Sequence, residues 1–395
     1  MLRAINERTV LEAIRVLGPV SRAQLARHTG LSKPTVSQGL AALHSAGLLR
    51  EAGRTSGGKG PTALLYELNA NAGWVVGIDV GRSFVRAAAA DLTGQIVARQ
   101  DERARVRSSR SLIEQIGSMA HGVAAEAGIR WSDVTHATLG SPGVFDAPRD
   151  QVALAHNLPG WGRPGLAEAV REALGTRVSF ENDVNLAAVG EYWRGLAKGV
   201  PNFVFLHVGT GVGMGLVIRD ELFRGATGAA GEIGYVPIAA DPHERKSRLR
   251  GSLESAAGAA GVVGAAKRLG MKPPLTPRKI FAAARRGDPT ALKVVAIEAE
   301  RIALAIAAVI PVVDPELVIL GGGIGRNADL LLEPVRRELH QISPFHPRVD
   351  VSALGGDATI QGAVSLALQA AQSQLFARGE ADASRPSPRS WRSAS

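Results

Sequence analysis

A unit that occurs twice in the chain, an apolar run followed by a glycine-rich turn, constrains the fold more than any other feature of the sequence. Residues 74–81 form such a run, and residues 203–213 repeat the pattern. Residues 134–143 and 317–325 likewise each lead from an apolar run into a glycine loop. Short apolar runs bounded by glycine are typical of buried strands in α/β sheets. Because the related segments are about 120 to 180 residues apart, we predict a duplication, with two related α/β lobes and a cleft between them.

Length and composition indicate a globular protein of several domains. The chain has 395 residues, of which 45 % are apolar and 21 % charged, so it is too long for one core and typical of a soluble protein. No apolar run approaches the roughly 20 residues of a membrane span, and the N-terminus lacks the apolar stretch of a secretory signal. The absence of cysteine excludes disulfides and thiolate metal sites. We therefore expect a cytoplasmic protein.

Residues 1–71 have the pattern of a winged helix-turn-helix domain. Apolar positions at helical spacing indicate a helix over residues 4–18. Ser21 and Ser32 are typical N-caps, and each is followed by a further helical pattern. A short helix, a glycine-containing turn and a third helix with a polar first turn together predict the motif.

Polar residues of the third helix and of a basic loop are candidates for contacting double-stranded DNA. Two strand-like runs, 48–51 and 63–68, enclose this loop, which would form the wing. Residues 1–71 hold nine Lys or Arg against four Asp or Glu, as expected for a domain that binds a polyanion. A helical protein-interaction module with a flexible basic loop is the alternative. The residues expected to reach bases or phosphates are Lys33, Thr35, Ser37, Gln38, Arg54 and Lys59.

The rest of the chain is expected to form the two lobes and a tail. Residues 74–190 would form the first α/β lobe, and a helix at about 356–374 would return to complete it. Residues 191–355 would form the second lobe. Ser, Arg, Pro and Ala dominate residues 376–395, and this composition predicts a disordered tail.

The segment 181–185, Glu-Asn-Asp-Val-Asn, is a candidate ligand site. It follows a strand-like run and opens a helix-like one, and the ends of strands are where open α/β sheets bind ligands. Asn and Asp offer the donors and acceptors that a polyhydroxylated ligand needs, and a carboxylate here could also act as a general base. On these five residues alone, a helix N-cap is the simpler interpretation.

Three further motifs raise a family resemblance. Residues 156–161 read His-Asn-Leu-Pro-Gly-Trp, residues 209–213 read Gly-Thr-Gly-Val-Gly, and residues 228–235 read Gly-Ala-Ala-Gly-Glu-Ile-Gly-Tyr. With the duplicated glycine turns, they resemble the sugar kinase, heat-shock protein and actin superfamily. More narrowly, roughly residues 5–372 resemble the ROK family of repressors, open reading frames and sugar kinases. A winged helix joined to such a body is the arrangement of the family's transcription factors, of the N-acetylglucosamine and xylose repressor type.

This resemblance implies a fold and a sugar site. The fold is α/β: an N-terminal winged helix-turn-helix followed by a two-lobed, duplicated actin-like or RNase H-like sugar kinase body. In family kinases the Asp of the Glu-Asn-Asp motif takes the proton of the attacking sugar hydroxyl, and Asp183 stands at that position. For Glu232 and Glu254 the alternative is a solvated pair beside a glycine turn. The residues that the resemblance implies for sugar binding are Asn157, Asn182, Asp183, Glu232, Tyr235 and Glu254.

Departures from the kinase pattern argue against a cofactor. The phosphate turn Asp-x-Gly-Gly-Thr is here Asp-Val-Gly-Arg-Ser, so Arg82 replaces a glycine whose backbone must approach phosphate, and a left-handed φ there would be disfavoured. The family's zinc site uses a His and three Cys, but Tyr235 holds the His position and residues 238–252 contain no Cys. We expect neither family zinc nor magnesium-ATP, and regard His243 as a surface residue. Remnants of a nucleotide site would be Asp79, Gly81, Gly209, Thr210, Gly211, Gly322 and Gly323.

Two hypotheses for function follow. The leading one is a sequence-specific DNA-binding transcriptional regulator rather than an enzyme, a repressor of carbohydrate metabolism genes. It would bind its operator as a homodimer or a tetramer, with no membrane partner, and a sugar or sugar derivative in the cleft would control it. The alternative is an ATP-dependent sugar kinase of the ROK family, favoured by Asp183 and the intact turn 209–213.

Overall fold

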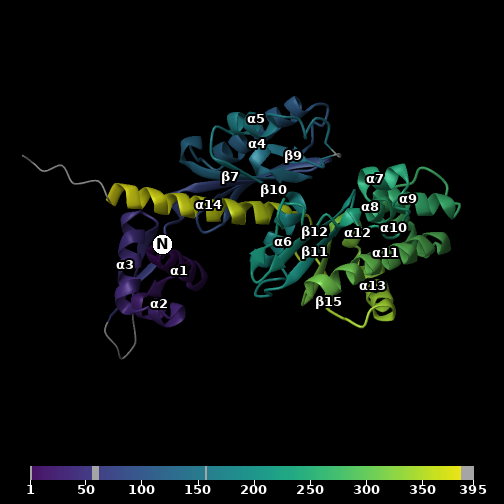
Figure 1. Ribbon diagram of the computed structural model, residues 1–395. Helices are drawn as coiled ribbons and strands as arrows, with labels where there is room; N and C mark the ends of the chain where they lie inside the picture. Colours follow the sequence, from purple (N-terminus) through teal and green to yellow (C-terminus); the bar gives the residue numbers. More distant parts are fainter. Residues whose placement is uncertain (1, 56–61, 156–157, 384–395) are drawn as a thin grey trace, which may run out of the picture.

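The structure is a computed structural model that describes residues 2–55, 62–155 and 158–383. A small N-terminal domain lies beside a larger body built on two sheets (Figure 1). In the part of the chain that is described, no helix combines the length and apolar character needed to span a membrane. The N-terminal domain has three helices, α1 (Leu2–Leu17), α2 (Arg22–Thr29) and α3 (Lys33–Ser45), and a sheet of order β1-β3-β2, formed by Val20–Ser21, Leu64–Leu68 and Leu49–Arg54.

Local sequence explains where the helices of the N-terminal domain begin. The Ser21 hydroxyl accepts a hydrogen bond from the backbone N–H of Gln24, and the Gln24 side chain accepts one from the Ser21 N–H at 2.9 Å. This reciprocal capping box satisfies two donors that a helix start leaves free. Ser32 caps α3 through the N–H of Thr35. The predicted winged helix-turn-helix and both of its serine caps are confirmed.

The first sheet of the body is built around strand β4 (Trp74–Val80). On one side β4 pairs antiparallel with β5 (Phe84–Asp91), which pairs antiparallel with β6 (Ile96–Arg103). On the other side it pairs parallel with β7 (Val134–Ser141), which pairs parallel with β10 (Val178–Asn182). The strand order is therefore β10-β7-β4-β5-β6.

The second sheet repeats this arrangement around β11 (Phe203–Val208). Strands β12 (Val212–Ile218) and β13 (Glu221–Leu222) continue it antiparallel, and β14 (Leu317–Gly321) and β15 (Arg348–Val351) continue it parallel. The order is β13-β12-β11-β14-β15. Read from its antiparallel edge, the first sheet is β6-β5-β4-β7-β10, and the two sheets then match strand for strand. The predicted duplication is thus confirmed. A separate hairpin pairs β8 (Val144–Asp146) with β9 (Gln151–Ala153).

Helices cover both faces of each sheet because the strands are apolar on both faces. In the first lobe, α4 (Ser109–Glu126) and α5 (Leu166–Leu174) cover one face (Figure 1). In the second lobe, Phe203 and Phe205 of β11 face α6 (Asp183–Arg194), and the alternate residues of the strand join the large core on the other side. The helices of that side are α7 (Arg245–Arg250), α8 (Ser252–Ala257), α9 (Ala259–Arg268), α10 (Pro277–Arg285), α11 (Pro289–Val313), α12 (Gly322–Gly325) and α13 (Ala328–Ile342).

The C-terminal helix α14 (Ala358–Ala383) connects the parts of the molecule. It lies along the first sheet, with one end beside α6 and the other beside the N-terminal domain (Figure 1). Its buried residues Ile360, Val364 and Leu368 belong to one hydrophobic cluster with core residues of α1 and α3. The predicted disorder of residues 376–395 is wrong for 376–383, which continue this helix; residues 384–395 lie outside the described part.

Helices α6 and α14 cross with almost no space between their backbones. A Cβ added at Gly190 of α6 would lie 2.1 Å from the carbonyl oxygen of Ala358. A Cβ added at Gly362 of α14 would lie 1.8 Å from that of Leu186. These two glycines therefore allow the helix that begins at the segment 181–185 to pack directly on the helix that reaches the N-terminal domain.

Candidate functional site

A cleft of about 680 Å³ lies between the two sheets. It opens at the carboxyl ends of β4, β10, β11 and β14, so both halves of the duplication contribute to it. Ligands of open α/β sheets bind at this edge of the strands. Of the predicted ligand residues, the cleft brings together Asp79, Gly81, Asn182, Asp183, Gly209, Thr210, Gly211, Glu232, Glu254, Gly322 and Gly323.

Asn182 and Asp183 stand where β10 ends and α6 begins. The Asn182 side-chain oxygen accepts hydrogen bonds from the N–H groups of Val184 at 2.8 Å and Asn185 at 3.2 Å, so Asn182 is the N-cap of α6. Its side-chain nitrogen donates to the Gly143 carbonyl at 3.0 Å. The N-cap interpretation of the segment is therefore correct for Asn182, and this cap fixes the position of the Asp183 carboxylate at the cleft.

The pKa of Asp183 lies far above the ordinary value of an aspartate carboxyl. Desolvation, followed by the negative charge of Asp79, raises the pKa of Asp183 to about 7, and Glu232 adds to the shift. The N–H of Val184 donates to its carboxylate at 3.0 Å and opposes the rise in pKa. A carboxyl group with a pKa near neutrality can accept or release a proton at physiological pH.

Glu232 and Glu254 do not form a solvated surface pair. The Glu254 carboxylate accepts a hydrogen bond from the Val212 N–H at 3.1 Å, beneath the turn that follows β11. Both side chains are half-buried and line the cleft. Desolvation raises the pKa of Glu232, and the neighbouring negative charge of Glu254 raises it further. Their partial burial at the cleft favours the predicted ligand role over the solvated alternative.

The glycine turns are necessary for the shape of the cleft. Gly322 has a left-handed φ of 82°, and a Cβ there would lie 2.4 Å from the carbonyl oxygen of Val208. A Cβ at Gly211 would lie 2.5 Å from a carboxylate oxygen of Glu254. A side chain at Gly322 would push the turn away from the backbone of β11, and one at Gly211 would displace the Glu254 carboxylate. The turns therefore leave backbone atoms, rather than side chains, at this wall of the cleft.

Asp79 is paired with an arginine that the sequence analysis did not identify. Asp79 and Arg86 are direct cross-strand partners in the antiparallel pair of β4 and β5. Nη1 of Arg86 donates to Oδ2 of Asp79 at 2.6 Å. Burial raises the pKa of Asp79, and the Arg86 guanidinium opposes that rise. A tight turn over residues 81–83 would place residues 79 and 86 opposite each other, so the register of the hairpin was the signal available in the sequence.

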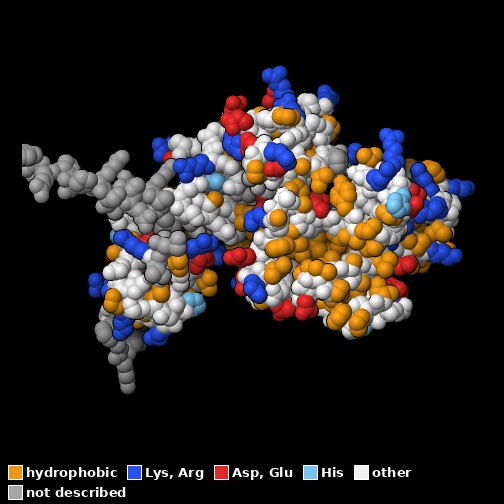
Figure 2. Space-filling model, in the orientation of Figure 1, with side chains coloured by type: hydrophobic (Ala, Val, Ile, Leu, Met, Phe, Trp, Pro, Cys, Tyr) orange, Lys and Arg blue, Asp and Glu red, His pale blue; other side chains and the backbone are white. Residues whose placement is uncertain are grey.

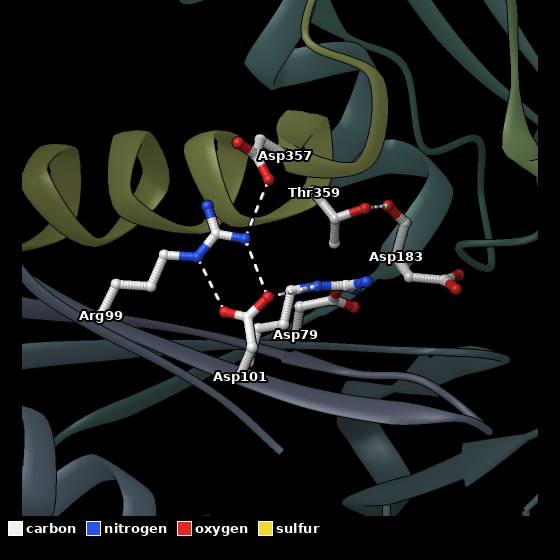
Figure 3. A network of polar contacts seen from close by, with 7 residues as sticks. Asp79, Arg99, Asp101, Asp183, Asp357 and Thr359 are labelled. Carbon is white, nitrogen blue, oxygen red and sulfur yellow. Dashed lines mark hydrogen bonds and ion pairs between the residues drawn. The ribbon is translucent and has the colours of Figure 1, made fainter. Parts of the chain in front are cut away.

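The ion pair of Asp79 and Arg86 is the first of a series of ion pairs that leads to the start of α14. Nε of Arg86 lies 3.3 Å from Asp101 on β6, and Arg99 donates to Asp101 at 2.8 and 3.0 Å. Arg99 also donates to Asp357, directly before α14, at 2.9 Å. Figure 3 shows Asp101 and Arg99 between the first sheet and the start of α14, where Thr359 reaches the backbone of Asp183. The floor of the cleft is thus connected to the first turn of α14.

Arg82 does not have the strained backbone that the sequence analysis considered. It is absent from the described residues with positive φ other than glycine. Its exposed side chain lines the cleft, and no hydrogen bond or ion pair to it is found within the described ranges. His207 of β11 also lines the cleft. Desolvation, with a smaller contribution from Arg326, lowers the pKa of His207 to about 4, so it is a neutral hydrogen-bonding group at pH 7.

The predicted sugar ligand Tyr235 is not part of the cleft lining. Tyr235 follows Glu232 by one helical turn but is 37 % exposed and is not part of the lining. Its hydroxyl lies 3.5 Å from the Leu249 carbonyl, at the limit of a hydrogen bond. Asn157 lies outside the described residues.

The residues at the family's zinc position do not fit a zinc ion. The His position is Tyr235, and the run 238–252 ends in α7 and the start of α8 without a thiolate. Within residues 2–55, 62–155 and 158–383, no group of three or more His, Cys, Asp or Glu side chains is arranged to hold a metal. Structural zinc needs four good ligands, which this donor set does not supply.

Five of the six predicted DNA-contacting residues fall in the described part of the chain, where they are exposed or half-buried. Lys33 and Gln38 are exposed at the start of α3, and Arg54 is exposed at the end of β2. The hydroxyl of Ser37 donates to the Lys33 carbonyl at 2.8 Å, and the hydroxyl of Thr35 lies 2.8 Å from that of Ser32. Figure 2 shows Lys and Arg side chains at several places on this domain. Lys59 falls outside the described residues.

The fold and the cleft together define a two-lobed, sugar-kinase-like protein with a winged helix-turn-helix domain at its N-terminus. The chain belongs to the ROK family, whose sequence profile matches residues 75–370. A profile of the MarR family matches residues 4–58, the region of the winged helix-turn-helix.

Relatives of the chain include both regulators and kinases. The xylose repressor of Caldicellulosiruptor bescii is 26 % identical over 93 % of this chain and 96 % of its own length. The glucokinase of Thermotoga maritima is 32 % identical over 58 % of this chain and 77 % of its own length. The regulator match therefore spans the N-terminal domain as well as the body.

The similar solved structures also include both a regulator and a kinase. A ROK family transcriptional regulator, homologous to the E. coli MLC protein, has a TM-score of 0.80 at 22 % identity and covers 96 % of this chain and 99 % of its own. A ROK family glucokinase from Streptomyces griseus, solved with glucose and AMPPNP, has a TM-score of 0.66 at 28 % identity. It covers 75 % of this chain and 100 % of its own.

Proposed function

We propose that this protein is a sequence-specific DNA-binding repressor of carbohydrate metabolism genes whose operator affinity is set by a sugar. The observation that carries the proposal is the continuity of one hydrophobic cluster from the core of the winged helix-turn-helix to α14. The other end of α14 lines the ligand cleft through Ala358 and Thr359. The DNA-binding domain and the cleft are thus two ends of one packed unit.

The chemistry of the cleft favours a polyhydroxylated ligand. Asp183, Glu232 and Glu254 supply acceptors, the second hydrogen of the Asn182 amide supplies a donor, and neutral His207 supplies either. The relatives named as xylose repressors and glucokinases support a sugar, and D-xylose and D-glucose are the first effectors to test.

Regulation requires that the ligand favour one arrangement of the molecule over the other. A sugar bound by Asp183 of the first lobe and Glu254 of the second would favour a closed cleft. Closure would move α6, and α14 with it, because the two helices cross in backbone contact. A homodimer in the cytoplasm would bring two winged helices to half-sites about one helical turn of DNA apart, so a small change in their spacing would weaken binding.

The experiment is an electrophoretic mobility shift of the DNA upstream of the protein's own gene with the full-length chain, with and without D-xylose, D-glucose and amino sugars. We expect a shifted band that one sugar abolishes. Gln38→Ala should need a higher protein concentration for the same shift, and Arg110→Ala, an exposed change on α4 of the body, should shift the DNA as the wild type does. If the wild-type chain shifts no operator DNA under low-salt conditions, the repressor proposal is wrong.

A sugar kinase remains the second candidate because Asp183 stands in the cleft with a pKa near 7. The measurement is formation of sugar phosphate from ATP, Mg²⁺ and a panel of hexoses. We expect no turnover above that of Asp183→Asn. Turnover at rates of roughly 1–100 per second, typical of kinases, would make the protein an enzyme.

A further inference from the structure

We propose that Arg86 occupies the place of a divalent cation beside Asp79, so that the cleft binds its ligand without a metal ion and excludes a magnesium-bound nucleotide. The fold of the ROK kinases implies magnesium-ATP at this position. The side chains of this chain do not fit it, and the disagreement can be traced to one arginine.

Asp79 and Arg86 place two opposite charges side by side in the cleft. Asp79 is at the end of the central strand of the first sheet, and Nη1 of Arg86 lies 2.6 Å from its Oδ2. Both residues line the cleft. A magnesium ion on this side of the oxygen would lie about 2.0–2.1 Å from it, in the space that the guanidinium nitrogen fills. The guanidinium and a metal ion therefore compete for one side of the same carboxylate.

Several contacts fix Arg86 in place. Its Nε lies 3.3 Å from Asp101, and its guanidinium stacks 5.7 Å from the ring centroid of Phe84. The side chain is only 25 % exposed, and that of Asp79 is 8 % exposed. Moving the guanidinium away would break contacts to two carboxylates and an aromatic ring at once. A metal ion beside it would meet a like charge in a partly desolvated site.

A magnesium ion beside Asp79 would also need further oxygen ligands. Mg²⁺ requires oxygen ligands in near-octahedral geometry and usually takes one or two carboxylates together with substrate phosphates. Asp183 is another carboxyl group that lines the cleft, and its pKa is raised to about 7. About half of this carboxyl is protonated at neutral pH, and a protonated carboxyl is a poor metal ligand. Once Asp79 is neutralised by Arg86, the first lobe offers no good anchor for the metal.

The test measures metal binding directly, with Mn²⁺ as the probe. Electron paramagnetic resonance of free Mn²⁺ is recorded during titration of the full-length protein, alone and with a non-hydrolysable ATP analogue. We expect no saturable Mn²⁺ binding by the wild-type chain. Arg86→Ala frees the Asp79 carboxylate and removes one unit charge, so it should bind Mn²⁺ with the analogue in a saturable way. Its dissociation constant should lie at least about tenfold below the highest protein concentration at which the wild type shows no binding. Asp79→Asn in the same background should abolish the gain.

Two controls keep the outcome interpretable. Arg110→Ala removes an exposed arginine of α4 outside the cleft and should gain nothing. Arg86→Gln keeps an amide donor for Asp79 and serves if Arg86→Ala unfolds, and Mn²⁺ should then raise its melting temperature. The proposal fails if wild type binds the manganese–nucleotide as tightly as the Arg86 variants, or if folded Arg86 variants gain no binding. Operator binding plays no part in this experiment, so its result is independent of the repressor proposal.

Discussion

At the scale of single residues, the surroundings of Asp183 couple the stability of the protein to pH. The pKa of its carboxyl is about 7 in the folded chain, against 3.8 as the ordinary value. Between these values the folded state holds a proton that the unfolded state has lost. Unfolding then releases a proton, so the free energy of unfolding falls as pH rises from about 4 to about 7.

Asp183→Asn removes this titration and should flatten the pH dependence. Since a pKa change of one is worth about 1.4 kcal/mol, the variant should gain a few kcal/mol relative to wild type between pH 5 and pH 8. Chemical denaturation at both pH values measures it. Glu114→Gln, an exposed carboxylate of α4, is the control and should keep the wild-type profile. Parallel profiles for wild type and Asp183→Asn would contradict the assignment.

At the scale of elements, the crossing of α6 and α14 depends on two glycines. Gly362→Ala would place a methyl group 1.8 Å from the Leu186 carbonyl oxygen, where only backbone movement can relieve the clash. Overpacking of this kind costs about 1–3 kcal/mol, and a lower melting temperature should follow. Gly264→Ala is the matched control, because a Cβ there on α9 would meet only the tip of Arg268 at 3.5 Å. Equal melting temperatures for the two variants would mean that the helices separate without cost.

The same elements show which parts of the molecule were predictable from sequence. Serine caps and apolar periodicity are local signals, so the winged helix-turn-helix followed from them. The duplication followed from repeated strand and glycine patterns. The length of α14 did not, because Ala-rich sequence after residue 374 favours a helix by propensity while its polar composition resembles a linker.

The ion pair of Asp79 with Arg86 was missed for a different reason. The pair depends on the register of the β4–β5 hairpin. The position of the turn sets this register, and no single residue type indicates it. Likewise, only the packed structure brings Asp357 next to Arg99, 258 positions earlier in the chain.

At the scale of the whole molecule, the affinity for DNA should have two parts. One comes from charge and is the same for all sequences, and the other comes from contacts to the bases of the operator. Lys33→Ala should weaken binding to all DNA sequences and reduce the slope of log affinity against log salt by about 1. Gln38→Ala should instead weaken operator binding by about 1–3 kcal/mol while leaving binding to random DNA unchanged. Fluorescence anisotropy at several salt concentrations measures both, with Arg110→Ala on the body as the charge control. If both variants behave like that control, α3 does not contact DNA.

Effector control should depend on the chain of contacts from the cleft to α14. Arg99→Ala removes the bridge between Asp101 and Asp357 and leaves the cleft lining and the N-terminal domain intact. Its affinity for operator alone and for the releasing sugar alone should equal wild type. The factor by which the sugar weakens operator binding, commonly 5- to 150-fold in coupled sites, should fall by at least about threefold.

The coupling is measured as operator affinity at zero and saturating sugar, and by linkage the operator must weaken sugar binding by the same factor. Arg130→Ala, whose partner is the neighbouring Asp133 on the outer surface, is the matched control. A wild-type factor in Arg99→Ala would show that the sugar acts through the crossing of α6 and α14 alone. A reduced factor with both single affinities preserved would place the ion-pair chain on the path from cleft to DNA, because no change in either binding site could produce it.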